Sequence, residues 1–397
     1  MIKYKIFLLV FLMQIYSHSQ KTNTIKEIPA INFQTQVDGK TTNLYTLKNK
    51  NGMTTQITNY GARVVSLWVP DRKGDFQDVV WGFETIAEYL ASSDIYCGPI
   101  VGRFGNRIDK GRFELNGTQF QVTINNNENH LHGGTKGFYA KVWDANSVKI
   151  EGNEALELTY FSKDGEEGYP GNLTIKVTYM LTEDNSLKLL YSATTDKTTI
   201  INPTSHCYFN LSGTSKNTIL EHVLFINAQK FTPTNEGLIP TGELRNLKDT
   251  PLDFNTPTAI GDRIESKYEQ LLFGKGYDHN FIINKPMGSY EKIATIYSPE
   301  TGVLMAVNSD QPGLQFYSGN FMKGNLKGKR GDDHNYRTGF ALETQNFPDA
   351  PNHPNFPSAV LEPNHAYEQT TSYTSVSYTH LRAHETGRNL VCRLLLE

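Results

Sequence analysis

A histidine between small polar residues is the first candidate for chemistry in this chain. His206 lies in residues 201–211, INPTSHCYFNL, a segment that is otherwise apolar and aromatic. Histidine changes charge near neutral pH, so a buried one can donate or accept a proton at little cost. Asn202 and Ser205 are close enough in sequence to fix the orientation of its ring. Taken alone, such a histidine is more often a hydrogen-bonded core residue than a catalytic one.

A carboxylate in apolar surroundings is the second candidate. Glu343 is the sole charged residue of residues 339–348, GFALETQNFP. Burying a carboxylate is expensive unless it is paired or used in chemistry. Asp278, in residues 276–281, GYDHNF, is a second acidic group in a similar setting. A structural ion pair is the alternative interpretation for Glu343.

Two other segments carry directional hydrogen-bonding groups. Residues 102–108, GRFGNRI, combine glycines, which let the backbone approach a ligand, with the donors of Asn106 and Arg107. Residues 129–134, NHLHGG, would place His130 and His132 on one face of a strand. The pair lacks a nearby third ligand, which disfavours a metal site. A hydrogen-bonding role for one histidine, facing a cleft across the two glycines, fits better.

Strands must position these groups, because alternation of apolar and polar residues dominates the chain. Residues 63–70, 156–160 and 173–181 each alternate with a period of two, the mark of a strand with one buried face. A polar turn at 183–186 precedes another strand at 187–193, which predicts a hairpin.

Helical signals are few. Thr85 and Glu88 form a capping-box pattern ahead of a short helix at 86–90, and residues 258–272 can hold another. Long irregular stretches at 232–255 and 346–357 are typical of functional loops. We therefore predict an all-β fold of packed antiparallel sheets with few short helices.

Domain organisation follows from where these patterns begin and end. We predict a signal peptide at 1–19, a flexible segment at 20–30, one large domain at 31–374 and an atypical tail at 375–397, either disordered or foreign to the native protein. The tail shows neither strand alternation nor a capped amphipathic helix, and the spacing of its His380 and His384 lacks a third metal ligand.

The amino-acid composition indicates which kinds of ligand or partner the protein can bind. The 397 residues carry a formal net charge of −3 without a basic patch, so nucleic acid is not expected to bind. The 21 Tyr, 21 Phe and 3 Trp suit strands and also the faces of sugars. The odd set of Cys97, Cys207 and Cys392 contains no C-x-x-C pair, which predicts neither a disulfide framework nor a cysteine-based zinc site.

The N-terminus has the pattern of a targeting segment. Lys3 and Lys5 precede an apolar run at 6–16, and small residues at 17 and 19 resemble a cleavage site. The run is short for a membrane span, and no cysteine follows it for lipid attachment. We expect cleavage near Ser19 and an exported bacterial protein, periplasmic or secreted, without stable membrane association. An uncleaved anchor is the alternative.

Seven motifs in order resemble those of the aldose 1-epimerases, or galactose mutarotases, over about residues 60–373. They are GRFGNRI at 102–108, NHLHGG at 129–134, SHCYFNL at 205–211, TPTNEGLIPTGE at 232–243, GYDHNF at 276–281, QPGLQFY at 311–317 and LETQNFP at 342–348. One such match could arise by chance, but the ordered set is specific.

This resemblance implies a β-supersandwich with an open cleft for an aldohexose and acid–base chemistry without a cofactor or metal. It assigns His206 as general acid and Glu343 as general base. The family's sugar-binding positions fall on Asn106, Arg107, His132, Tyr208, Asp278 and Gln315. Ser205 stands where many members have asparagine, and Gly105 where alanine is common. Neither departure is expected to remove activity, and only Ser205 bears on the orientation of His206.

Three other functions use some of the same residues. A glycoside hydrolase would need two carboxyl groups, for which Glu343 and Asp278 are available. A non-catalytic carbohydrate-binding protein would suit the aromatic content and export. An epimerase of phosphorylated hexoses would need a cationic cluster, for which Arg103 and Arg107 are the candidates. Sugar preference and oligomeric state do not follow from the sequence.

Overall fold

The computed structural model describes residues 25–213, 216–324 and 327–377. The predicted signal peptide at 1–19 and residues 378–397 of the predicted tail lie outside these residues. No helix among the described residues has the length and apolar character needed to cross a membrane.

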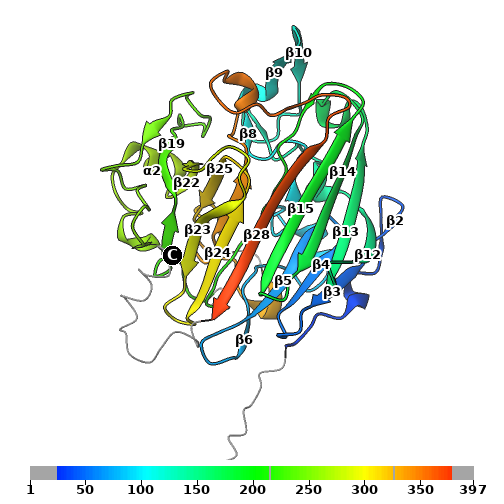
Figure 1. The fold of residues 1–397 in the computed structure, drawn as a ribbon, viewed down its shortest axis with the longest axis vertical. Coiled ribbons are helices and arrows are strands. Elements are labelled where there is room, and N and C mark those ends of the chain that lie inside the picture. The colour runs from blue at the N-terminus through cyan, green and yellow to red at the C-terminus, as the bar shows by residue number, and fades with distance from the viewer. Residues whose placement is uncertain (1–24, 214–215, 325–326, 378–397) are drawn as a thin grey trace, which may run out of the picture.

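A nine-stranded antiparallel sheet forms one broad layer of the molecule (Figure 1). Its order is β12-β13-β14-β15-β28-β24-β23-β18-β21. The strands are β12 (Asp144–Ile150), β13 (Asn153–Ser162), β14 (Leu173–Leu181), β15 (Ser186–Thr195), β18 (Val223–Ile226), β21 (Thr258–Ala259), β23 (Glu291–Tyr297), β24 (Val303–Ser309) and β28 (Tyr367–Ser377). The last strand, β28, continues past the predicted domain end at 374 and occupies the middle of the sheet.

Two smaller antiparallel sheets lie beside it. The four-stranded sheet contains β3 (Leu44–Lys48), β4 (Thr54–Thr58), β5 (Arg63–Pro70) and β6 (Phe76–Asp78). The five-stranded sheet has the order β20-β19-β22-β25-β26, with β19 (Ala228–Thr232), β20 (Arg245–Asn246), β22 (Asp278–Ile283), β25 (Gly313–Tyr317) and β26 (Ala341–Gln345). One buried hydrophobic cluster contains side chains from all three sheets, so the core lies between them.

Short elements complete the fold. The two-stranded pairs are β1 (Gln36–Val37) with β2 (Lys40–Thr41), β7 (Ile100–Val101) with β17 (Thr204–Ser205), β8 (Arg107–Ile108) with β11 (His130–Leu131), β9 (Arg112–Leu115) with β10 (Thr118–Gln121), and β16 (Thr199–Ile200) with β27 (Val360–Leu361). The α-helices are α1 (Ile86–Ala91) and α2 (Glu269–Gly274). The 3₁₀ turns are η1 (Ala30–Phe33), η2 (Asp109–Gly111), η3 (Phe138–Ala140), η4 (Glu166–Gly168), η5 (Ile260–Asp262), η6 (Lys329–Gly331) and η7 (Ala350–Asn352).

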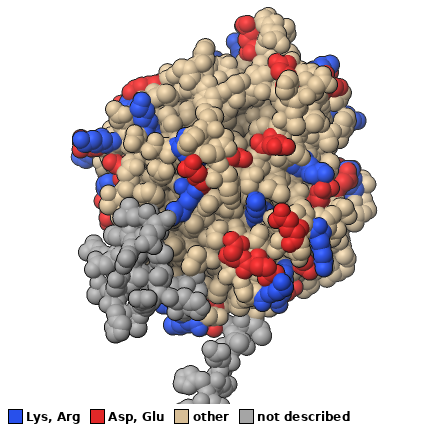
Figure 2. All heavy atoms as spheres, in the orientation of Figure 1, with Lys and Arg blue, Asp and Glu red and all other residues tan. Residues whose placement is uncertain are grey.

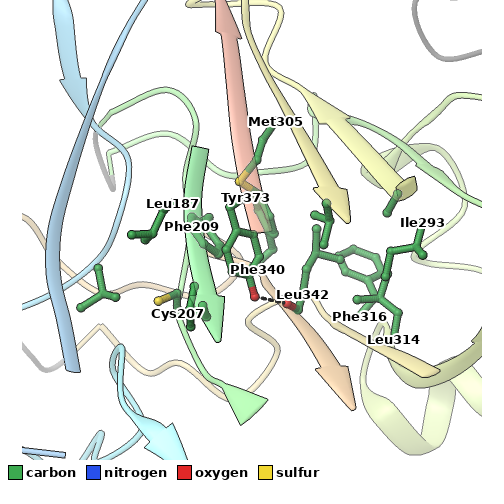
Figure 3. Close-up of a cluster of buried hydrophobic side chains, with 14 of the residues drawn as sticks. Leu187, Cys207, Phe209, Ile293, Met305, Leu314, Phe316, Phe340, Leu342 and Tyr373 are labelled. Atoms are coloured by element: carbon green, nitrogen blue, oxygen red, sulfur yellow. Dashed lines mark hydrogen bonds between the residues drawn. The ribbon is translucent and has the colours of Figure 1, made fainter. Parts of the chain in front are cut away.

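Strand alternation separates the core from the polar groups of interest. Figure 3 shows Leu314 and Phe316 of β25 and Leu342 of β26 inside the hydrophobic cluster. The hydroxyl of Tyr373 also donates a hydrogen bond of 2.9 Å to the carbonyl oxygen of Leu342. Because successive side chains of a strand point to opposite faces, the neighbouring Gln315 and Glu343 point away from this cluster.

The predicted fold class is confirmed, and so are several of its elements. The strands at 63–70 and 173–181 have the predicted bounds, and the predicted hairpin forms between β14 and β15. Helix α1 begins at a complete capping box between Thr85 and Glu88. The region 258–272 is mostly not helical: it holds β21, η5 and only the start of α2.

Charged side chains of both signs are interspersed on the face seen in Figure 2. This pattern agrees with the small formal net charge of −3.

Candidate active site

The predicted site residues meet at one cleft. Its volume is about 740 Å³, and its wall contains seven of the eight predicted residues: Asn106, Arg107, His132, His206, Tyr208, Asp278 and Glu343. The eighth, Gln315, is buried and bonded to a residue of the wall. Segments that are far apart in sequence therefore supply a single pocket of the size usual for small-molecule sites.

His206 is held by backbone pairing on both sides. It follows β17, whose Ser205 pairs with Ile100 of β7. The amide of His206 donates to the carbonyl of Pro99 (2.8 Å), and the amide of Gly98 donates to the carbonyl of His206 (3.0 Å). These bonds fix the backbone at His206, while Cys207 and Phe209 fill the core (Figure 3).

Strand register brings the polar groups of the five-stranded sheet together. Gln315 of β25 lies directly opposite Glu343 of β26 and, on its other side, opposite Asn280 of β22. Directly opposite side chains in an antiparallel pair lie on the same face. Asp278 is two residues before Asn280 on β22, so it shares that face and lies diagonal to Gln315.

His206 and Glu343 form the centre of the site. Nε2 of His206 lies 3.6 Å from Oε1 of Glu343, and both side chains are at most 5% exposed. Nδ1 of His206 and Oε2 of Glu343 are buried without a hydrogen-bond partner among the described residues. A buried polar atom without a partner costs about 1–3 kcal/mol, so both are poised to bond a ligand.

Burial sets the protonation of this pair. It raises the pKa of the Glu343 carboxyl well above its usual value, and the negative charge of Asp278 adds to the rise while Arg107 opposes it. Burial lowers the pKa of His206 to about 4. Both shifts favour the uncharged forms of the two groups in the free cleft.

Asp278 is tied to its surroundings by two partners. The Gln315 amide donates to its Oδ1 at 2.7 Å, and Nη1 of Arg107 lies 4.0 Å from its Oδ2. Burial raises the pKa of Asp278, while Arg107 and Gln315 oppose this rise. Arg107 is in turn oriented by a bond of 3.3 Å from its Nε to Asn126.

The tautomer of His132 follows from one hydrogen bond. The backbone amide of Asn106 donates to Nδ1 of His132 at 3.1 Å, so Nδ1 is the unprotonated nitrogen. Burial lowers the pKa of His132 well below its usual value, and the nearby His206 adds to this shift. His132 is therefore neutral and carries its proton on Nε2, as a donor.

The amino-acid sequence of this chain matches a known protein family. Residues 43–374 match the family model described as Aldose 1-epimerase. The chain belongs to the aldose 1-epimerase family. A galactose mutarotase of Bos taurus is 41% identical over 317 residues, which span 79% of this chain and 89% of that protein. An aldose 1-epimerase of Escherichia coli is 31% identical over 355 residues, 89% and 99% of the two chains.

Solved structures of the aldose 1-epimerase family have the same fold. A crystal structure of an aldose epimerase homologue from C. elegans is 29% identical, with a TM-score of 0.77, and covers 85% of this chain and 99% of its own. A galactose 1-epimerase from Lactobacillus acidophilus is 27% identical, with a TM-score of 0.75, over 86% and 96% of the two chains. The protein is thus an isomerase of the aldose 1-epimerase type.

One predicted pairing within this epimerase site is wrong. His130 and His132 do not share a strand face, because β11 ends at Leu131 and His132 adopts a φ of 51°. The His130 ring lies 2.6 Å from the carbonyl of Thr123 and 2.5 Å from the hydroxyl of Tyr169, which gives it a structural role. Gly133 is required nearby, since a Cβ there would lie 1.7 Å from the carbonyl oxygen of Gly102.

The expected orientation of His206 by its sequence neighbours is also wrong. The Ser205 hydroxyl lies 3.4 Å from Sγ of Cys207. The amide group of Asn202 bonds backbone atoms of Gly105 and Asn346. The ring of His206 is instead surrounded by other rings, which are those of Tyr96, His132 and Tyr208 at centroid distances of 5.7, 5.1 and 5.0 Å.

Several wall residues carried no signal in the sequence. Tyr96 contacts both His132 and His206, and Phe321, Lys275 and Lys323 also line the cleft. Only proximity in sequence to the 102–108 motif could have pointed to Tyr96.

Arg103, considered with Arg107 as a phosphate-binding group, does not reach the epimerase cleft. Its guanidinium bonds the carbonyls of Pro170 and Gly171 and the hydroxyls of Ser162 and Thr199. It therefore has a structural role in the interior.

Proposed function

We propose that this protein interconverts the α and β anomers of free aldohexoses, such as glucose and galactose, through acid–base ring opening. The observation that carries this proposal is the buried His206–Glu343 pair, 3.6 Å apart in the wall of a cleft. Its two unpartnered atoms can each bond an oxygen of the sugar. The matching family and relatives support the same activity.

The reaction needs one proton removed and one supplied. Glu343, as carboxylate, takes the proton of the C1 hydroxyl while His206, as imidazolium, donates to the ring oxygen. The bond from C1 to the ring oxygen breaks, and C1 becomes an aldehyde. Rotation about C1–C2 and closure in the reverse sense give the other anomer, with protons and electrons conserved. General acid and base groups each contribute about 10²–10⁴-fold to such rates.

The proton needed for this chemistry is already in the site. In the free cleft it resides on Glu343, since burial favours the neutral forms. Transfer from Glu343 to His206 yields the reactive carboxylate–imidazolium pair without exchange with solvent. Polar sugar groups that bond the unpartnered atoms of both residues favour this charged form.

The remaining residues hold the substrate. We assign hydrogen bonds with sugar oxygens to Arg107, to the Nε2–H of His132 and to Asp278. Asn106 orients His132, and Gln315 orients Asp278. Tyr208 packs edge-on against the His206 ring and limits its rotation. Such preorganised contacts reduce the reorganisation needed during the reaction.

Two of the alternative functions, the hydrolase and the non-catalytic binding protein, fit this cleft less well. A hydrolase needs two carboxyl groups free to flank a glycosidic bond, but Asp278 is bonded to Gln315 and faces Arg107. A non-catalytic binding protein has no need for a buried acid–base pair. Lys275 and Lys323 line the cleft, so phosphorylated hexoses belong in the assay as competing substrates.

The N-terminal pattern of residues 1–19 supports export of the protein. We propose cleavage near Ser19 and a periplasmic or secreted enzyme. N-terminal sequencing of the protein from cell fractions tests this: an intact Met1 in the cytoplasmic fraction would contradict it.

Polarimetry provides the test of activity. Fresh α-D-galactose and α-D-glucose should reach their equilibrium rotation faster with the protein than without it, and Glu343→Gln should abolish the acceleration. Glucose 6-phosphate and an aryl glycoside serve as parallel substrates. Acceleration for the phosphorylated sugar only, or release of the aryl group, would refute the proposed substrate or reaction.

A further inference from the structure

A second cluster of ligand-forming side chains lies apart from the His206–Glu343 pair. Asp94, Cys97 and His334 each offer one atom, a carboxylate oxygen, a sulfur and a ring nitrogen, and these atoms all lie within 4.8 Å of one another. Asp94 and His334 line the cleft, and Cys97 is fully buried. The cluster therefore joins the interior to the cleft wall.

Two buried polar atoms of this cluster have no hydrogen-bond partner among the described residues. They are Oδ2 of Asp94 and Nδ1 of His334. His334 as a whole is only 2% exposed. Two such atoms from separate segments would each cost free energy unless a ligand engaged them.

The ring of His334 is held in place. It stacks on Trp81 at a centroid distance of 4.4 Å and an interplanar angle of 6°, and Phe83 contacts it at 5.2 Å. Trp81 in turn contacts Tyr208, which packs against His206. A rigid ring lowers the entropic cost of binding an ion, and this stack of rings connects the cluster to the proposed catalytic histidine.

The charges of the cluster suit a divalent ion. A carboxylate and a thiolate would together neutralise it, which a buried position favours. Nearby cations already have partners: Arg63 donates to the carbonyls of Ile95, Cys97 and Tyr139, and Lys329 pairs with Asp78 at 2.7 Å. Binding would release the thiol proton of Cys97, as metal binding to cysteine generally does.

We propose that Asp94, Cys97 and His334 bind Zn²⁺ in the cleft wall, leaving a fourth position for water or a sugar hydroxyl. Zinc accepts oxygen, sulfur and nitrogen ligands together, and three protein ligands with one open position is a common arrangement. The ion would join the segment between α1 and β7 to the segment between η6 and β26, both of which border the cleft. This inference does not depend on the proposed function.

The sequence could not show this site. The absence of a C-x-x-C pair argues only against sites built from closely spaced cysteines. Asp94 and Cys97 lie three residues apart, but His334 comes from a distant segment that only the fold brings near.

Cobalt substitution tests the site directly, because a thiolate ligand gives Co²⁺ a sulfur-to-metal charge-transfer band in the near ultraviolet. The titration uses the metal-free full-length chain with Cys392→Ser, since Cys392 lies outside the described residues. We expect the band to saturate at one equivalent and Zn²⁺ to displace it. Cys97→Ser should abolish the band. Cys207→Ser is the matched control: it removes an equally buried thiol, bonded to Ser205, and should leave the band unchanged.

Other results of the cobalt titration would show that the ion binds at a different site in the protein. Binding of Co²⁺ without the band would place the ion elsewhere, for example at His132, His206 and Glu343, whose ligand atoms also lie within 4.8 Å of one another. That result, or a band that survives Cys97→Ser, overturns the proposal. If Cys97→Ser does not fold, His334→Gln decides: the affinity should fall at least about tenfold, and an unchanged affinity overturns the proposal.

Discussion

Nε2 of His206 lies 3.6 Å from Oε1 of Glu343, and burial shifts the pKa of each residue towards its uncharged form. In the uncharged form of the pair, the titratable proton is on Glu343. Moving it to His206 changes the charge of each partner but not the total proton count. The pair must therefore be treated as one titrating unit, whose apparent pKa values belong to both residues.

The first prediction concerns this pair. His206→Asn and Glu343→Gln should each lower kcat by about 10²–10⁴-fold, because each removes one of the two proton-transfer groups. The double variant should be little worse than either single variant, since residues that act as a unit are not additive. Polarimetry measures the rates, and circular dichroism checks the fold.

His222→Asn is a matched control for this prediction. His222 is also buried, and its Nε2 accepts a hydrogen bond from the amide of Leu211 outside the cleft. This variant should lose stability but keep its turnover once folded. A folded Glu343→Gln variant with a nearly normal rate would refute the assignment of Glu343.

The second prediction is a bell-shaped dependence of kcat/KM on pH. Activity requires the pair to hold one proton. As the pH falls towards about 4, His206 of the free enzyme gains a second proton and activity is lost. As the pH rises through the raised pKa of Glu343, the proton is lost and activity falls again. A profile with its acid limb near pH 6.5, the ordinary histidine value, would contradict this picture.

The third prediction uses the two charges that act on Glu343. Asp278 raises the pKa of Glu343, and Arg107 lowers it. Asp278→Asn should therefore move the alkaline limb to lower pH, and Arg107→Gln should move it to higher pH. Both variants also lose substrate contacts, which lowers kcat/KM at every pH. The measurement that tests the prediction is therefore the pH of the alkaline limb, and not the maximum value of kcat/KM. Equal displacement in the same direction would show that these charges do not control Glu343.

Local patterns were enough to predict much of the fold. The alternation from Leu173 to Leu181 gives β14 with its observed bounds, and Thr85 with Glu88 gives the start of α1. Both signals depend on residues a few positions apart. The helical pattern of region 258–272 is misleading, because tertiary pairing of β21 with β18 overrides its weak helical preference.

The site was partly predictable for a different reason. His206, Glu343 and Asp278 were identified from a family resemblance and from their apolar surroundings. Their arrangement depends on the register of β22, β25 and β26, which no local pattern specifies. Tyr96 and His334 illustrate the same limit, since their contacts with the cleft arise only when distant loops converge.

The fourth prediction tests what orients the catalytic histidine. Since the Ser205 hydroxyl lies against Cys207 and not against His206, Ser205→Ala should leave kcat within about twofold of the original value. It should cost at most about 1 kcal/mol of the free energy of unfolding, as for one ordinary hydrogen bond. Polarimetry and thermal unfolding of the same preparation measure the two effects. A hundredfold loss of kcat, with the acid limb of the pH profile and the melting temperature unchanged, would instead show that Ser205 positions His206 during the reaction. The rings of Tyr96, His132 and Tyr208 would then not be sufficient to hold the His206 ring.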